Sequence, residues 1–129
     1  MSQAARNPVG WFEIYVQDIS RAKKFYEGVF GVRLAELPSP VPGLEMWAFP
    51  MVDEAYGSPG ALVKMEGGPS TGGCGTLIYF SCDDCSVEES RVAGAGGVVE
   101  RSKFPIGPYG FISFVKDSEG NMIGLHSRA

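Results

Sequence analysis

Apolar and polar positions in the first third of the chain predict a strand followed by a helix. Residues 11–16 are rich in aromatic and β-branched side chains, the composition of a strand. Asp18 follows and can accept hydrogen bonds from the free amides at the start of a helix. The next apolar residues have the spacing of one buried helical stripe: Ala22, Phe25, Tyr26 and Val29. Gly31 is suited to end this helix, because glycine readily adopts the left-handed conformation.

Three further strands are expected before the middle of the chain. Residues 32–37 and 44–49 have strand composition and are separated by a proline-rich stretch that predicts a loop. A polar turn precedes a short strand at residues 61–65. The glycine-rich residues 67–73 predict a flexible linker. The first half therefore has the order β-α-β-β-β.

The second half predicts the same order of elements. Residues 76–82 form an almost unbroken apolar run, as in a strand buried on both faces. Ser86 and Glu89 match a capping box, which predicts a helix up to about Ala95. The remaining strands are expected at residues 98–103, 111–115 and 122–127.

An internal repeat relates the two halves. A shift of about 66 residues places Val16-Gln17-Asp18 on Cys82-Asp83-Asp84, and Gly31 on Gly97. One strand–helix unit is therefore expected to occur twice.

Composition and charge limit the classes of function. With a net charge of −4, the chain lacks the excess of Lys and Arg expected of a nucleic-acid-binding protein. Residues 1–8 have no apolar core of a signal peptide, and we expect residues 1–9 to be a loosely held arm. No apolar run is long enough to cross a bilayer. The odd number of cysteines, Cys74, Cys82 and Cys85, indicates free thiols in a reducing compartment, so a cytoplasmic protein is expected.

The repeated modules, the signature Val16-Gln17-Asp18 running to Phe25-Tyr26, and the ending at residues 117–126 together resemble one family. This is the vicinal oxygen chelate superfamily, which includes glyoxalase I, bleomycin-resistance proteins, fosfomycin-resistance enzymes and extradiol dioxygenases. The resemblance implies an α+β fold of two tandem βαβββ modules, whose curled mixed sheets form a cleft, usually in a homodimer. Residues 1–129 would then be a single domain, with module one at about 8–66, a linker at 67–75 and module two at about 76–127.

The resemblance also implies where a metal would bind. In enzymes of the superfamily, His and Glu from the first and last strands of each module hold a divalent metal. The equivalent positions here are Trp11, Leu77, Gly124 and, by an alignment of the modules through Gly60 and Gly120, Lys64. None of these side chains suits a metal ion. We therefore expect a cleft without metal or other cofactor, and a divalent metal at displaced ligands is the alternative.

Polar residues next to these positions could still act on a ligand, because side chains two apart share one face of a strand. The candidate ligand-binding residues are Trp11, Glu13, Trp47, Lys64, Tyr79 and His126. Glu13 as a base and His126 as an acid are the candidate catalytic residues. The structural alternative is that Glu13 is a buried carboxylate bonded to Tyr79 or paired with Lys64, and that His126 is a structural hydrogen-bonding residue.

Three functions remain open from the sequence. The first is metal-free binding of a small, partly aromatic or amphiphilic molecule, as in the bleomycin-resistance branch. The second is a metal-dependent lyase or isomerase of the lactoylglutathione lyase (glyoxalase I) type, with Glu13 and His126 among its ligands. The third is a dimer whose cleft is vestigial and whose surface binds other proteins. The spacing of Cys82 and Cys85 resembles a redox motif, but acidic neighbours raise thiol pKa values, so two incidental thiols are expected.

Overall fold

The computed structural model describes residues 6–39, 41–66 and 75–129. These residues cluster into two compact units. The N-terminal unit comprises Trp11–Ile78, and the C-terminal unit comprises the described residues up to Gly10 together with Tyr79–Ala129.

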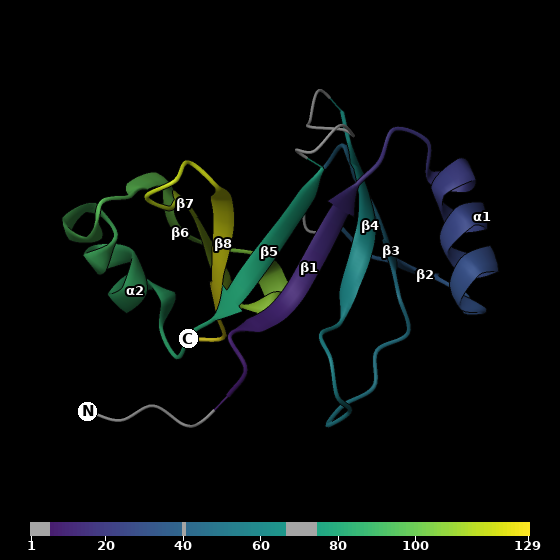
Figure 1. The fold of residues 1–129 in the computed structure, drawn as a ribbon, viewed down its shortest axis with the longest axis horizontal. Coiled ribbons are helices and arrows are strands. Elements are labelled where there is room, and N and C mark those ends of the chain that lie inside the picture. Colours follow the sequence, from purple (N-terminus) through teal and green to yellow (C-terminus); the bar gives the residue numbers. More distant parts are fainter. Residues whose placement is uncertain (1–5, 40, 67–74) are drawn as a thin grey trace. The chain divides into compact units, whose positions relative to one another are not determined.

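The N-terminal unit is built on four strands and one long helix (Figure 1). Its elements are β1 (Val9–Tyr15), α1 (Ile19–Phe30), β2 (Ala35–Leu37), β3 (Leu44–Ala48) and β4 (Gly60–Met65). The strand order is β2-β3-β4-β1. The β1–β4 pair is parallel and the other pairs are antiparallel, so this sheet is mixed.

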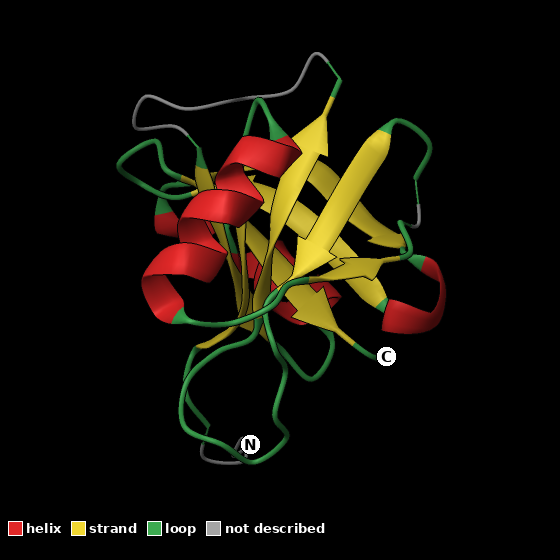
Figure 2. Cartoon of the chain, turned by 90° about the vertical axis from the view of Figure 1, so that its right-hand side faces the viewer, coloured by secondary structure: helices red, strands yellow, loops and turns green. Residues whose placement is uncertain are grey.

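Helix α1 begins and ends where the sequence predicts. The Asp18 carboxylate accepts a hydrogen bond of 3.0 Å from the backbone N–H of Arg21. Gly31 adopts φ of 66° and donates its N–H to the carbonyl of Glu27 at 2.9 Å. Between these caps, α1 lies against one face of the sheet, in front of the strands in Figure 2. Ile19 and Tyr26 pack there with the fully buried Leu62 of β4, and this apolar contact holds the helix on the sheet.

The C-terminal unit repeats this arrangement with a shorter helix (Figure 1). Its elements are β5 (Thr76–Ser81), α2 (Cys85–Arg91), a 3-10 turn (Ala93–Ala95), β6 (Val98–Pro105), a second 3-10 turn (Gly107–Tyr109), β7 (Phe111–Lys116) and β8 (Met122–Ser127). The strand order is β5-β8-β7-β6, and β5 and β8 are parallel. The predicted α+β class and the two βαβββ modules are confirmed.

The predicted capping box of α2 is wrong. Asp84 is the cap, and its Oδ1 accepts the backbone N–H of Ser86 at 3.0 Å. Glu89 instead accepts the backbone N–H of Lys103 at 2.7 Å. Asp84 therefore leaves Glu89 free to satisfy a strand amide. The left-handed residue after the 3-10 turn is Gly96, with φ of 99°.

Strand β6 contains two irregularities that the sequence does not reveal. Its register against β7 shifts between Val99 and Arg101, and again between Arg101 and Phe104. Each shift places one extra residue in β6 relative to β7. A bulge of this kind reverses the face to which the following side chains point.

Residues 6–8, directly before β1, are held more firmly than expected. The backbone N–H of Ser81 donates to the carbonyl of Pro8 at 2.9 Å, and Arg6 forms an ion pair of 2.7 Å with Asp83. The predicted linker at residues 67–73 lies outside the described residues. Within the described parts of the chain, no helix has the length and apolar character needed to cross a membrane.

Candidate functional site

Glu13 is a buried carboxylate on the face of the N-terminal sheet opposite α1, here called the N-terminal open face. Its side chain is 7% exposed. The indole N–H of Trp11 donates to Glu13 Oε2 at 3.1 Å, and the Tyr15 hydroxyl donates to Oε1 at 2.8 Å. Burial, followed by the negative charge of Glu13, raises the pKa of Tyr15, which therefore remains a hydrogen-bond donor. The three side chains form a ladder along β1.

Lys64 and Trp47 lie on the opposite face of this sheet from Glu13. Glu13 pairs with Ala61, whereas Trp47 pairs with Leu62, the residue that packs under α1. Lys64 is two residues beyond Leu62 and therefore shares the face that α1 covers. The expectation that Lys64 shares a face with Glu13 is wrong, because the alignment through the two glycines is out of register.

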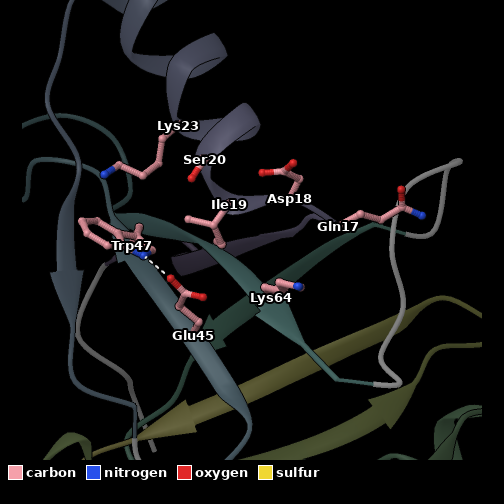
Figure 3. Close-up of a pocket in the computed structure, with 8 residues that line it drawn as sticks. All are labelled: Gln17, Asp18, Ile19, Ser20, Lys23, Glu45, Trp47 and Lys64. Atoms are coloured by element: carbon pink, nitrogen blue, oxygen red, sulfur yellow. Dashed lines mark hydrogen bonds between the residues drawn. The ribbon is translucent and has the colours of Figure 1, made fainter.

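Trp47 and Lys64 instead line an open hollow of about 370 Å³ beside the start of α1 (Figure 3). The ammonium of Lys23 lies 3.6 Å from the centre of the Trp47 ring. The indole N–H of Trp47 donates to Glu45 at 2.9 Å. The full lining is Gln17, Asp18, Ile19, Ser20, Lys23, Glu45, Trp47 and Lys64. The two lysines and two carboxylates of the lining balance in formal charge.

The ring of Tyr79 covers the backbone of Gly124 on the face of the C-terminal sheet opposite α2, here called the C-terminal open face. The two residues are partners in the β5–β8 register. A Cβ atom added at Gly124 would overlap the Tyr79 ring. Tyr79 is itself 5% exposed. Position 124 is therefore glycine because an aromatic ring occupies the space of its side chain.

Tyr79 is the first member of a row of side chains across this face. The centres of the Tyr79 and Phe114 rings are 6.2 Å apart, and those of Phe114 and Phe104 are 5.9 Å apart. The guanidinium of Arg101 lies 3.5 Å from the centre of the Phe104 ring. We call Tyr79, Phe114, Phe104 and Arg101 the aromatic row. Sequence reasoning missed its last three members. Arg101 in particular would share the face of Val99 in a regular strand, and the first register shift in β6 brings it opposite Phe114 instead.

His126 lies on the same face, as its register partner Ile112 does. The Nε2–H of its ring donates to the carbonyl of Tyr109 at 2.7 Å. A carbonyl can only accept, so this bond places a proton on Nε2. The bond supports the structural role considered for His126 and fixes the orientation of its ring.

Cys82 and Cys85 lie in the core under α2, with Val115 and Leu125. Burial, assisted by the nearby Glu88 carboxylate, raises the pKa of the Cys82 thiol to about 12. Cys85 has no exposed surface. The environment of Cys82 suppresses the reactive thiolate, which is the opposite of what a redox centre requires.

The residues at the expected metal positions do not fit a metal ion. Tyr79 pairs with Gly124, and the 66-residue shift carries Tyr79 to Glu13, which pairs with Ala61. Ala61, rather than Lys64, is therefore the equivalent of Gly124 in module one. Trp11, Leu77, Gly124 and Ala61 offer no donor atom. Among the residues described in either unit, no three His, Cys, Asp or Glu side chains are grouped to hold a metal.

The sequence matches a model of the Glyoxalase/Bleomycin resistance protein/Dioxygenase superfamily over residues 9–125. The chain belongs to this superfamily. The match includes both βαβββ modules and agrees with the resemblance found in the sequence.

Proteins with glyoxylase-type names resemble this chain over nearly its whole length. CFP32 of Mycobacterium tuberculosis, provisionally named a glyoxylase, is 30% identical over 129 residues, which is 96% of this chain and 47% of CFP32. This chain therefore spans about half the length of that relative. A glyoxylase-like domain-containing protein of Didymella fabae is 27% identical over 122 residues, which is 93% of this chain and 93% of that protein.

Solved structures with the same fold are more distant in sequence. Methylmalonyl-CoA epimerase of Streptomyces coelicolor, in complex with 2-nitronate-propionyl-CoA, has a TM-score of 0.67 and 16% identity, covering 97% of this chain and 99% of its own. A hypothetical protein of Bacillus halodurans has a TM-score of 0.71 and 14% identity, covering 94% of each chain. At this level of identity the likeness establishes the glyoxalase fold alone.

Proposed function

We propose that this glyoxalase-superfamily chain binds a small, partly aromatic or amphiphilic molecule and needs no divalent metal to do so. The Tyr79 ring over Gly124 carries the proposal, because it fills the space in which a ligand residue of the last strand would stand. The corresponding position in module one, Ala61, has no donor atom either. Trp11 stands at the first metal position and donates a hydrogen bond to Glu13.

In this proposal each unit offers ligand-binding residues on its own open face. Trp11 and Glu13 lie on that of the N-terminal unit, and Tyr79 and His126 lie on that of the C-terminal unit. The half-buried indole of Trp11 and the buried phenol ring of Tyr79 supply apolar surface, while the carboxylate and imidazole supply polar contacts. Trp47 and Lys64 offer a second, separate place for a ligand in the hollow beside α1.

The experiment combines metal analysis with thermal unfolding. Purified protein is analysed for Zn, Ni, Mn and Fe before and after treatment with a chelator, and a panel of aromatic acids, acyl-CoA esters and glutathione conjugates is screened by melting temperature. A molecule that binds only the folded state must raise the melting temperature. We expect at least one member of the panel to do so equally in chelated and untreated protein.

The rival function makes the opposite prediction. A lactoylglutathione lyase-type enzyme with displaced ligands would retain a stoichiometric metal, and Glu13→Gln or His126→Ala would release it. Turnover of the glutathione hemithioacetal of methylglyoxal would then depend on that metal. Either result would contradict metal-free binding and support the metal-dependent enzyme.

The resemblance also suggests a homodimer acting in the cytoplasm. Light scattering of the purified chain tests the first part, since a dimer has twice the monomer mass of 13.8 kDa. A monomer mass at the concentration at which ligand binds would contradict it.

A further inference from the structure

The C-terminal open face carries cations and aromatic rings but no carboxylate at its paired positions. The register places Arg101 opposite Phe114, and Lys116 opposite Met122, all on the face that bears Tyr79 and Gly124. Among the paired residues of this face, none is Asp or Glu. The chain has a net charge of −4, whereas both charged residues paired on this face, Arg101 and Lys116, are cations; Glu100, beside Arg101, falls at the first register shift and has no partner in the register.

The position of Arg101 is fixed by the fold. Its guanidinium stacks at 3.5 Å on Phe104, whose ring in turn contacts Phe114. Stacking leaves the edge of the guanidinium available for a planar anion, which it can bind through two parallel hydrogen bonds. Arg101 is exposed, whereas Phe104 and Phe114 are half-buried. The row therefore runs from apolar rings to an accessible cation.

Lys103 provides the contrast. It is only two residues from Arg101, yet the second bulge turns it to the face covered by α2. Its ammonium lies 4.6 Å from the centre of the Phe111 ring and forms an ion pair of 2.9 Å with Asp84. Lys103 is thus neutralised inside the unit, and Arg101 has no carboxylate opposite it in the register. Of these two cations, Arg101 is the one placed for a ligand.

We propose that the aromatic row binds a flat, conjugated molecule with an anionic group, the ring system lying on Phe114 and Phe104 and the anion on Arg101. This inference rests on the proposed function and assigns the chemical class of its ligand. Aromatic rings stack on one another in tilted and offset geometries such as those within the row, so a further ring can extend it. The absence of paired carboxylates on this face favours an anion over a cation.

The test compares three probes by isothermal titration calorimetry. The probe 2-naphthoate is aromatic and anionic, 2-naphthalenemethanol is aromatic and neutral, and cyclohexanecarboxylate is anionic but not aromatic. We expect 2-naphthoate to bind most tightly to the wild type. Arg101→Gln should weaken the binding of 2-naphthoate about tenfold and leave the binding of 2-naphthalenemethanol unchanged. The ratio of the two affinities should therefore approach one. Phe114→Leu should weaken both aromatic probes.

Lys103→Gln is the matched control, because it removes a cation from the same strand but from the other face. We expect it to leave the affinity for 2-naphthoate unchanged. Circular dichroism spectra of all variants verify folding, and exposed Arg101 offers a variant that does not disturb the core. Equal loss of 2-naphthoate binding in Arg101→Gln and Lys103→Gln would overturn the assignment, since it would reflect net charge alone.

Two further outcomes would overturn the inference and separate it from the proposed function. If 2-naphthoate fails to bind while another small molecule raises the melting temperature of metal-free protein, the ligand class is wrong and the proposed function stands. If no probe binds but Arg101→Gln changes the mass measured by light scattering, a second copy of the chain covers this face instead. Binding of 2-naphthoate only in the presence of a divalent metal would contradict the proposed function itself.

Discussion

The aromatic ring of Tyr79 rests directly on the backbone of Gly124, its register partner between β5 and β8. In the sequence, Gly124 stands at the position of a metal ligand, and Tyr79 looks like an unrelated aromatic residue. In the structure, the two residues pack together as one unit. The glycine exists to receive the ring, and the ring closes the space above the glycine. A single substitution at either residue must disturb the other.

Gly124→Ala should therefore lower the free energy of unfolding by about 1–3 kcal/mol, as expected for overpacking a filled site. Urea unfolding measures the change. Gly28→Ala is the control: Gly28 lies within α1, has open space around it, and should gain about 0.5–1 kcal/mol from the better helix propensity of alanine. Equal stability of Gly124→Ala and the wild type would mean that the Tyr79 ring does not rest on this glycine.

Glu13→Gln should destabilise the protein by about 1–3 kcal/mol, because the amide group of Gln would turn its NH₂ toward one of two hydrogen-bond donors. Glu45→Gln makes a close comparison, since Glu45 also accepts an indole N–H from a tryptophan two residues away, but at an exposed site. We expect a change of no more than about 0.5 kcal/mol there. Similar losses in both variants, measured by chemical unfolding, would argue against the buried ladder of Trp11, Glu13 and Tyr15.

Acid should weaken the folded state partly through Asp84. Its hydrogen bond from Lys103, followed by those from Ser86, lowers its pKa from the usual 3.8 to about 2. A carboxylate with a lowered pKa in the folded state stabilises it above pH 3.8, and this stabilisation is lost as the pH falls from there toward 2. Asp84→Asn should therefore be less stable at pH 7 and lose stability less steeply in that window.

Urea titrations at a series of pH values measure this slope. Asp117 also has a lowered pKa, chiefly because the Asn121 side chain donates to it. Asp117→Asn should also make the loss of stability below pH 3.8 less steep, independently of Asp84, since the two carboxylates occupy different turns, and the double variant should show the sum. A slope in Asp84→Asn that matches the wild type would mean that Asp84 is not held by Lys103 in solution.

The thiols of Cys82 and Cys85 should react slowly in the folded protein. A Cys74→Ser background removes the third cysteine, so that a chromogenic disulfide reagent reports these two alone. At pH 8, a thiol with a pKa of about 12 is almost entirely protonated, and Cys85 is inaccessible. We expect rapid reaction of both thiols only in denaturant; complete reaction of the native protein within seconds would contradict their burial.

The sequence predicted the elements far better than the faces of its strands. The cap at Asp18, the end at Gly31 and the strand at residues 122–127 follow from local chemistry, and the structure places all three as expected. Register is different, because it depends on partners distant in the chain. The alignment through Gly60 and Gly120 displaced the equivalent of Gly124 from Ala61 to Lys64, which placed a cation on the wrong side of β4.

The aromatic row shows the same limit for the candidate site. A regular strand would put Val99, Arg101 and Lys103 on one face, and nothing in their identity signals otherwise. Val99 lies on the α2 side; the first extra residue in β6 sends Arg101 to the open face, and the second returns Lys103 to the α2 side. Tyr79 could be named from the sequence because it is two residues from Leu77, an expected metal position. Phe104 and Phe114 have no comparable signal in the sequence.

The bulges in β6 also bear on how this surface could change during evolution. Loss of one codon between positions 99 and 104 would remove one of the two extra residues. The side chains of β6 beyond that point would then move from the α2 side to the C-terminal open face, or the reverse, while β7 kept its own sequence. A new set of side chains could thus be presented to a ligand in one genetic event, without any change in the amino acids that are already there.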